Sequence, residues 1–253
     1  MPTGAPALSV IVPVYREAAS LEALCDRMHA ALLGAGFDFE LLAVCDASPD
    51  DSWARLCDLA RSRPWLTGIR LPRNVGQHRA IFTGMQLARG SRLAVLDADL
   101  QDPPELLPSM LARLDQLGVD AVLARHPGRY QSALRMMSSR LFKRLRAWLS
   151  GGPPGAGLHF VMRREVLPRL SAFVAPTPFL VSMLAMSGAQ CAAIDVSRHV
   201  RSTGRSAYSE WRRLSVALRE LSWIILWRVV PPLRRYGKPR VSVVAETTQP
   251  LCR

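Results

Sequence analysis

The sequence predicts an α/β fold in which a doubly wound, mostly parallel sheet carries helices on both faces. Short runs rich in β-branched residues and leucine alternate with longer segments of helical periodicity from residue 8 to residue 124. This alternation is typical of βαβ units, which place their strands in a parallel sheet. Acidic and polar residues follow several of the runs directly. Because right-handed crossovers bring the carboxyl ends of parallel strands to one edge, we expect a site there.

The strands and helices of the first half follow from local patterns. Strands are expected where short apolar runs end at a turn-forming or acidic residue; they cover residues 8–14, 39–44, 67–71, 93–96 and 121–124. Helices are expected where apolar residues recur at a spacing of three and four; they cover residues 21–33, 52–60, 77–88 and 104–117.

The second half is less regular. We expect the following elements: an arginine-rich amphipathic helix over 132–149, a mobile glycine- and proline-rich loop over 151–157, a strand over 158–162, a helix from 165 to 173 and a strand over 195–201. The uncharged stretch 173–194 is long enough to span a bilayer, for which about 20 residues are needed. Its prolines and polar residues favour a buried helix and turn, and a membrane span is the alternative.

The C-terminal part predicts an amphipathic helical extension over 210–230 with Trp211, Trp223 and Trp227 among arginines. Tryptophan flanked by arginine suits a helix lying at a lipid surface. An ordinary helix packed on the domain is the alternative. The tail is expected to be a loose end or a short strand. The expected divisions are a catalytic domain over 1–208, a basic membrane-interface helix region over 209–240 and a tail over 241–253.

The charge of the chain points to an anionic partner. Its 33 lysine and arginine residues outnumber 20 aspartate and glutamate residues, which gives a net charge of +13. Anionic lipid or a phosphorylated substrate fits this excess. Nucleic acid is disfavoured because the arginines form no dense run and no recognition motif is present. An arginine-rich codon usage is the alternative origin of the charge.

Cysteine usage and the N-terminus indicate the cytosol. The cysteines are odd in number and widely spaced, which is typical of reduced thiols without a zinc site; they are Cys25, Cys45, Cys57, Cys191 and Cys252. We expect no signal peptide, since neither lysine nor arginine precedes the first apolar run.

Two carboxylates end the fourth expected strand. Asp97 and Asp99 follow the buried run 93–96, and Pro103-Pro104 then prevents the strand from continuing. Oxygen ligands at a strand's carboxyl end suit Mg²⁺ or Mn²⁺ that holds a diphosphate. A capped turn is the alternative, because aspartate and proline also favour turns.

Three motifs occur in order along the chain. They are Arg-Asn-Val-Gly at 73–76, Asp-Ala-Asp-Leu-Gln-Asp-Pro-Pro-Glu at 97–105 and Arg-Ser-Thr-Gly-Arg-Ser-Ala-Tyr at 201–208. Together they resemble inverting family 2 glycosyltransferases of the GT-A fold. The resemblance covers residues 8–208 and is greatest to polyprenyl-phosphate glycosyltransferases, such as dolichol-phosphate mannose synthase and its undecaprenyl-phosphate relatives. It implies a Rossmann-like GT-A domain and an enzyme of the cell envelope.

The resemblance also implies roles for individual residues. Asp97 and Asp99 would hold the divalent metal, with Gln101 close by. With Arg201 they would form the catalytic group, and the metal would neutralise the leaving nucleoside diphosphate. The donor, a UDP- or GDP-sugar, would be bound by Pro13, Tyr15, Glu17, Asp46, Ser48, Arg73 and Asp97. The acceptor phosphate would be bound by Arg125, Arg201 and Ser206.

The reaction implied is attack by a phosphate oxygen of a polyprenyl phosphate on the anomeric carbon of the sugar, with inversion. A phosphate monoester has a second pKa of about 6, so it is largely ionised near neutral pH. The enzyme therefore needs positioning and charge cancellation more than a strong general base. We expect the protein to act as a peripheral protein on the inner face of the cytoplasmic membrane.

The sequence departs from the family pattern at three places. Asp-Asp-Gly-Ser becomes Cys-Asp-Ala-Ser at 45–48, and the Lys-Glu frequent after Arg-Asn-x-Gly becomes Gln77-His78. Gly-Asp-Phe-Arg-Leu becomes Ala-Gly-Leu-His-Phe at 156–160, where His159 either partly replaces the arginine or is a loop histidine without a role. These changes leave two alternatives open: another acceptor for the same donor, or an impaired glycosyltransferase-like binding module.

Overall fold

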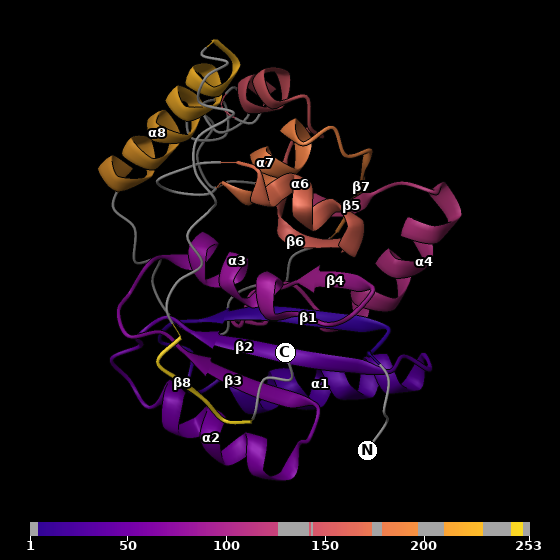
Figure 1. The fold of residues 1–253 in the computed structure, drawn as a ribbon, viewed down its shortest axis with the longest axis vertical. Coiled ribbons are helices and arrows are strands. Elements are labelled where there is room, and N and C mark those ends of the chain that lie inside the picture. The colour runs from indigo at the N-terminus through magenta and orange to yellow at the C-terminus, as the bar shows by residue number, and fades with distance from the viewer. Residues whose placement is uncertain are drawn as a thin grey trace.

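The structure, a computed structural model, describes residues 5–125, 142, 144–173, 179–196, 210–229 and 244–249. Its strands form one sheet in the order β7-β5-β6-β4-β1-β2-β3-β8 (Figure 1). The strands are β1 Leu8–Val14, β2 Phe39–Cys45, β3 Leu66–Arg70, β4 Arg92–Val95, β5 Ala121–Arg125, β6 Ala156–Arg163, β7 Cys191–Asp195 and β8 Glu246–Thr247. The α-helices are α1 Leu21–Gly34, α2 Ser52–Ser62, α3 Gln77–Leu87, α4 Leu107–Leu117, α6 Leu167–Ser171, α7 Leu180–Met186 and α8 Glu210–Val229.

The first four strands make a parallel half-sheet. Strand β1 pairs in parallel with both β2 and β4, and β2 pairs in parallel with β3. The order β1-β2-β3 is that of a mononucleotide-binding half of a doubly wound fold, and β4 lies on the other side of β1. The predicted α/β class and the predicted strands of this half are confirmed.

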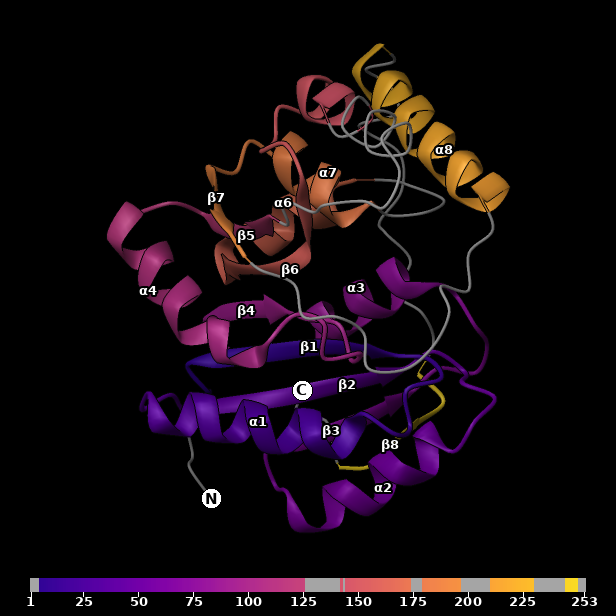
Figure 2. The same cartoon turned by 180° about the vertical axis from the view of Figure 1, so that it is seen from behind.

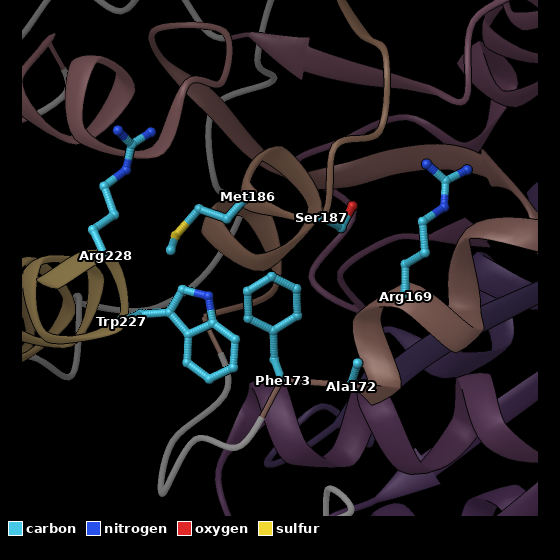
Figure 3. Close-up of a pocket in the computed structure, with 7 residues that line it drawn as sticks. All are labelled: Arg169, Ala172, Phe173, Met186, Ser187, Trp227 and Arg228. Carbon is cyan, nitrogen blue, oxygen red and sulfur yellow. The ribbon is translucent and has the colours of Figure 1, made fainter. Parts of the chain in front are cut away.

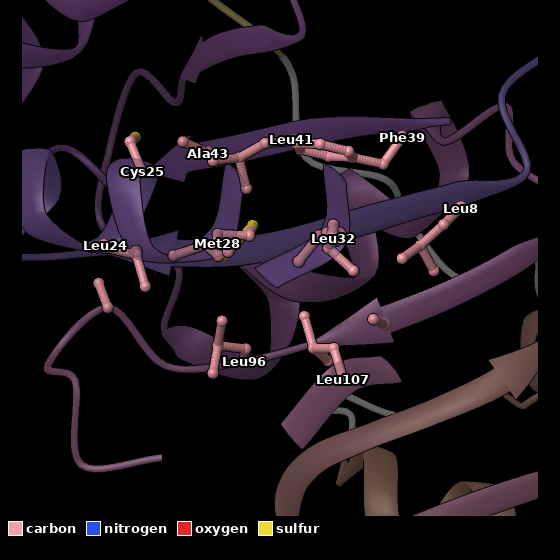
Figure 4. Close-up of a cluster of buried hydrophobic side chains, with 14 of the residues drawn as sticks. Leu8, Leu24, Cys25, Met28, Leu32, Phe39, Leu41, Ala43, Leu96 and Leu107 are labelled. Atoms are coloured by element: carbon pink, nitrogen blue, oxygen red, sulfur yellow. The ribbon is translucent and has the colours of Figure 1, made fainter. Parts of the chain in front are cut away.

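Helices cover both faces of the sheet. On one face α1, α2 and α4 enclose a core that includes Leu24, Met28 and Leu107 (Figures 2 and 4). On the other face α3, α6 and α7 enclose a second core around Ile81 and Phe160. The alternating side chains of β1 and β2 are divided between the two cores, which explains why both strands are buried throughout.

The second half corrects two predictions. The predicted loop 151–157 is wrong at its end, because β6 begins at Ala156, where it pairs with Arg125 of β5. Strand β6 runs antiparallel to both β4 and β5. Its first residues, Ala156 and Gly157, are therefore held in the sheet by strands that are distant in sequence. The predicted strand 195–201 is also displaced, since β7 is Cys191–Asp195 and residues 197–201 lie outside the description. His159, which lies in the predicted strand 158–162, is 2% exposed within β6, so it is not the loop histidine of the alternative.

Helix α8 confirms the predicted helix, and Trp223 and Trp227 follow the alternative of a helix packed on the domain. The Trp227 ring stacks on Phe173 with centroids 4.7 Å apart, and the Trp223 ring lies 6.4 Å from that of Phe179. Glu220, also on the inner face, accepts a buried hydrogen bond of 2.6 Å from the Ser182 hydroxyl. Trp223 and Trp227 therefore hold α8 on the protein, and the side chain of Trp211 is outside the description.

The chain returns to the opposite edge of the sheet after α8. Strand β8 pairs antiparallel with β3, and the Gly68 N–H donates to the Thr248 hydroxyl at 2.8 Å. The short-strand alternative for the tail is therefore the one found at 246–247. Of the predicted helix 132–149, residues 142 and 144–149 are described and helical. Over the described ranges, the structure contains no helix of the length and apolarity that a bilayer crossing needs.

Candidate active site

The loops after β1, β2, β3 and β4 meet at one edge of the sheet, because these four strands are parallel neighbours. Strand β5 also points to this edge, since β6 is antiparallel to both β4 and β5. Most residues predicted for the site are thereby brought to one side of the molecule; they are Pro13, Tyr15, Glu17, Asp46, Ser48, Arg73, Asp97, Asp99, Gln101 and Arg125. Arg201 and Ser206 lie outside the described residues, so their roles stay predictions.

Backbone strain is concentrated at the same edge. In the described part of the chain, the non-glycine residues with positive φ are Arg16, Ala47 and Leu100. They follow β1, β2 and β4, respectively, and Gly76, with φ of 90°, follows β3. Left-handed backbone costs a residue with a Cβ about 1–2 kcal/mol. Strained residues are typical of functional loops, whose shape the surrounding structure must impose.

Replacing Ala47 with glycine is expected to stabilise the protein. Ala47 has φ of 48°, where glycine has no Cβ penalty. After the entropy that glycine adds to the unfolded chain, the net gain is on the order of 0.5–1 kcal/mol in unfolding free energy. Denaturant unfolding measures it. The same substitution at Ala43, buried in β2, should destabilise; equal losses at both positions would exclude strain at Ala47.

Asp97 and Asp99 lie just beyond the carboxyl end of β4. Both side chains are partly exposed, so a ligand has access to them. Asp97 Oδ1 accepts a hydrogen bond of 2.6 Å from Gln77 Nε2, and Asp99 Oδ1 accepts one of 3.1 Å from the Gln101 N–H. No group of three or more potential His, Cys, Asp or Glu ligands occurs in the described ranges. Two carboxylates at an open edge fit a Mg²⁺ or Mn²⁺ ion that keeps sites for phosphate and water.

Asp46 organises the turn that follows β3. Its carboxylate accepts hydrogen bonds from the N–H groups of Val75 and Gly76, at 2.7 and 2.8 Å. Asn74 Nδ2 donates to the Asp46 carbonyl at 3.2 Å. Burial raises the pKa of Asp46, while the two N–H donors lower it. The motifs at 45–48 and 73–76 thus form one unit, a contact that sequence spacing alone does not reveal.

Ser48 joins the loops after β1 and β2. Its hydroxyl accepts a hydrogen bond of 2.7 Å from the Arg16 N–H and donates one of 2.5 Å to Asp50. Tyr15 is 42% exposed, and the Arg16 guanidinium lies 5.5 Å from the centre of its ring. A tyrosine ring in this position can stack on a nucleobase. Cys45, by contrast, is a core residue of β2 that cannot reach a ligand at the edge.

Arg125 is held by an acidic partner. Its guanidinium forms two bonds with the Asp195 carboxylate, Nε to Oδ1 at 2.5 Å and Nη2 to Oδ2 at 2.9 Å. This pairing raises the pKa of Arg125 and lowers that of Asp195. Any phosphate that reaches Arg125 must therefore share it with Asp195. Arg73 is exposed beside the turn that Asp46 holds.

A pocket of about 390 Å³ adjoins this edge. Val75, Gly76 and Gln77 form one side, and Gln77 is the residue that donates to Asp97. The remaining lining residues come from α3 and α8, from residue 142 and from Phe179, which precedes α7; they are His78, Arg79, Phe142, Phe179, Val216, Ala217, Arg219 and Glu220. Sequence reasoning missed this pocket because its walls are far apart in the chain; the Gln77-His78 departure was the available signal.

His78 is expected to make stability fall at acidic pH. Burial, with a smaller contribution from the charge of Arg146, lowers the pKa of His78 to about 4. The Leu180 N–H donates to His78 Nδ1 at 3.4 Å, which requires the unprotonated nitrogen. Because the unfolded chain binds this proton near pH 6.5, unfolding free energy should drop by about 2 kcal/mol between pH 7 and pH 5.

His78→Gln removes the titrating group and keeps an acceptor for the Leu180 N–H. Both proteins are unfolded with denaturant at pH 7 and at pH 5. The contribution of all other titrating groups then cancels in the difference between the two proteins. The variant should lose about 2 kcal/mol less than the natural protein over this interval. Identical pH dependence would contradict a His78 that stays neutral in the folded protein at pH 5.

Comparison with known proteins agrees with this geometry. The model of glycosyl transferase family 2 matches residues 9–171. An undecaprenyl-phosphate 4-deoxy-4-formamido-L-arabinose transferase of Shewanella sediminis is 36% identical over 208 residues, which cover 79% of this chain and 61% of that protein. The chain thus spans about three fifths of the length of the curated relatives it matches.

Solved structures share the fold. A mannosyltransferase from Pyrobaculum calidifontis, in complex with GDP-Man and Mn²⁺, has a TM-score of 0.64 at 23% identity. The matched region covers 94% of this chain and 67% of the mannosyltransferase chain. A glucosyl-3-phosphoglycerate synthase from Mycobacterium tuberculosis, with Mn²⁺, UDP and glucosyl-3-phosphoglycerate, has a TM-score of 0.60 at 18% identity. The matched region covers 88% of this chain and 80% of the synthase chain. The family match and the strand order together show that the chain belongs to glycosyl transferase family 2 and has the GT-A fold.

Proposed function

We propose that this protein transfers a sugar from a nucleotide-sugar donor to a polyprenyl phosphate, with inversion at the anomeric carbon. The observation that carries the proposal is the pocket lined by Gln77, whose side chain donates a hydrogen bond to the Asp97 carboxylate. A donor whose diphosphate lies at Asp97 and Asp99 has its sugar close to this pocket. An acceptor in the pocket is then placed to attack that sugar.

The donor is a nucleoside diphosphate sugar held at the edge of the sheet. Tyr15 stacks on the base, and the loop of Ser48 and the turn held by Asp46 border the nucleoside. Asp97 and Asp99 hold Mg²⁺ or Mn²⁺, with Gln101 beside them. This ion supplies the positive charge that stabilises the departing diphosphate. Structural neighbours in complex with UDP or GDP-Man and Mn²⁺ support this choice of ligand and metal.

The acceptor is a polyprenyl phosphate in the pocket of about 390 Å³, which we therefore call the acceptor-side pocket. Arg79 and Arg219 provide guanidinium groups for the phosphate, while Phe142, Phe179 and Val216 provide apolar surface for the first isoprene units. The ionised phosphate oxygen forms the bond to the anomeric carbon, and the bond to the nucleoside diphosphate breaks. No proton needs to be removed, so the reaction proceeds without the aspartate that the family has near 157.

The enzyme works at the inner face of the cytoplasmic membrane, where α8 meets the lipid. Trp223 and Trp227 face inward, but the helix carries apolar residues on its outer face. These residues, called the α8 stripe, fall within about 100° of one another around the helix at 3.6 residues per turn; they are Leu218, Ile225, Leu226 and Val229. Apolar side chains between arginines are typical of a helix at a lipid surface, and an anionic membrane matches the net charge of +13.

Leu226→Glu is expected to weaken membrane association by about tenfold. It removes an apolar side chain that the lipid would bury, and it adds a negative charge that anionic lipid repels. Cosedimentation with vesicles containing phosphatidylglycerol measures this. Leu117→Glu is the matched control, since Leu117 is 41% and Leu226 50% exposed and α4 lies on the opposite face of the sheet. Equal losses in both variants would contradict docking through α8.

Transfer of radiolabel from a nucleotide sugar tests the proposed reaction. With Mn²⁺ and undecaprenyl phosphate, label should enter a lipid that organic solvent extracts, in an amount limited by the acceptor. Label in a water-soluble or saccharide product would indicate another acceptor. No transfer from any UDP- or GDP-sugar would indicate the binding-module alternative.

A further inference from the structure

A second pocket lies between α6, α7 and α8, apart from the candidate active site. Its volume is about 600 Å³, and none of the described residues that line it belongs to the loops that hold Asp97 or Asp46 (Figure 3). The stacked rings of Phe173 and Trp227 form its apolar wall, together with Met186. Apolar surface of this kind suits a hydrocarbon chain more than a sugar or a nucleotide.

Positive charge stands at the rim of the pocket. Arg228 of α8 and Arg169 of α6 flank the apolar wall on two sides (Figure 3). Arg169 shares its charge with Asp120 at 3.3 Å, which makes Arg228 the stronger cation of the two. No carboxylate occurs among the described lining residues. The lining therefore matches a ligand with one anionic group and an apolar chain.

An aromatic row divides this pocket from the acceptor-side pocket. Trp227 stacks on Trp223 at 5.9 Å, Trp223 lies 6.4 Å from Phe179, and Phe179 lies 5.7 Å from His78. Phe179 and His78 line the acceptor-side pocket, whereas Trp227 lines the second pocket. A ligand in the second pocket consequently leaves the acceptor-side pocket open.

The second pocket includes the end of α8, the helix whose outer face we propose to meet lipid. Arg228 follows the buried Trp227 and is exposed, as are Leu226 and Val229 on either side of this pair in the sequence. We propose that this pocket binds one anionic phospholipid, with the phosphate on Arg228 and an acyl chain along Phe173, Met186 and Trp227. The proposal goes beyond the sugar-transfer reaction, since it assigns a lipid that is neither donor nor acceptor.

Titration of the full chain with a short-chain lipid below its micelle concentration separates this site from adsorption to a membrane. Dihexanoylphosphatidylglycerol should bind saturably with a stoichiometry of about one in calorimetry. Dihexanoylphosphatidylcholine, which has no net charge, should bind at least about tenfold more weakly, as expected for loss of a charge-assisted contact. Equal affinity for the two lipids, or no saturable binding of the anionic one, would overturn the proposal.

Two variants assign the site. Arg228→Gln should weaken phosphatidylglycerol binding by about tenfold, whereas Arg61→Gln, a matched loss of charge on the exposed face of α2, should not. Ala172→Phe fills the pocket from an exposed position without changing the charge of the protein, and it should abolish phosphatidylglycerol binding. Unchanged affinity in both Arg228→Gln and Ala172→Phe would overturn the proposal. Binding is read without donor, metal or acceptor, so its failure is distinct from failure of the transfer reaction.

Discussion

Asp99→Asn is expected to lower the rate of sugar transfer by about a thousandfold, which corresponds to about 4 kcal/mol of transition-state stabilisation. Asparagine keeps the size of the side chain and still accepts a hydrogen bond from the Gln101 N–H. In the proposed metal site, it removes a negative charge that would hold the divalent ion, and with the ion the positive charge that would stabilise the leaving diphosphate. Initial rates of label transfer at saturating donor, with Mn²⁺ varied, measure the effect.

Asp58→Asn is the matched control, because Asp58 lies on the surface of α2 and pairs with Arg61 at 2.8 Å. It should leave transfer and its metal dependence unchanged. Unfolding curves should show that Asp99→Asn folds normally, since Asp99 is partly exposed. A variant that folds and transfers sugar at the natural rate would remove Asp99 from the metal site.

Arg79→Gln is expected to raise the KM for polyprenyl phosphate by about 10- to 100-fold. A hydrogen bond to a charged group contributes about 1.5–3 kcal/mol, and each 1.4 kcal/mol is a factor of ten. Arg79 is on α3, in the wall of the acceptor-side pocket, and no motif of the donor site includes it. The KM for the nucleotide sugar should therefore stay close to its natural value.

Arg61→Gln controls for the loss of one positive charge, because Arg61 is distant from the pocket on α2. It should change neither KM. Equal increases in the KM of donor and acceptor in Arg79→Gln would indicate a general loss of structure. An unchanged acceptor KM would show that the phosphate is bound elsewhere, for instance at Arg125.

The parallel half of the fold could be predicted because its information is local. The apolar runs of β1, β2 and β4 are bounded by turn residues, and each helix between them has its own periodicity. Strands β6 and β7 carry weaker signals. Ala156 and Gly157 are poor strand formers, and only pairing with β5 places them in the sheet. The inward orientation of Trp227 likewise depends on Phe173, more than 50 residues away.

The site could be predicted in part for the same reason. Asp97 and Asp99 follow a strand directly, so their place at the sheet edge is determined by the chain itself. The link between Asp46 and the N–H groups of Val75 and Gly76 joins motifs about 30 residues apart and needed the fold. The acceptor-side pocket combines α3 with α8, and no periodicity in either helix indicates the other.

Crystals of the protein with Mn²⁺ and either UDP or GDP, measured at the manganese absorption edge, test the central claim most directly. The account predicts one anomalous peak bound by carboxylate oxygens of both Asp97 and Asp99 and by oxygens of the diphosphate. A nucleotide bound with Asp97 and Asp99 turned away from any ion would contradict it.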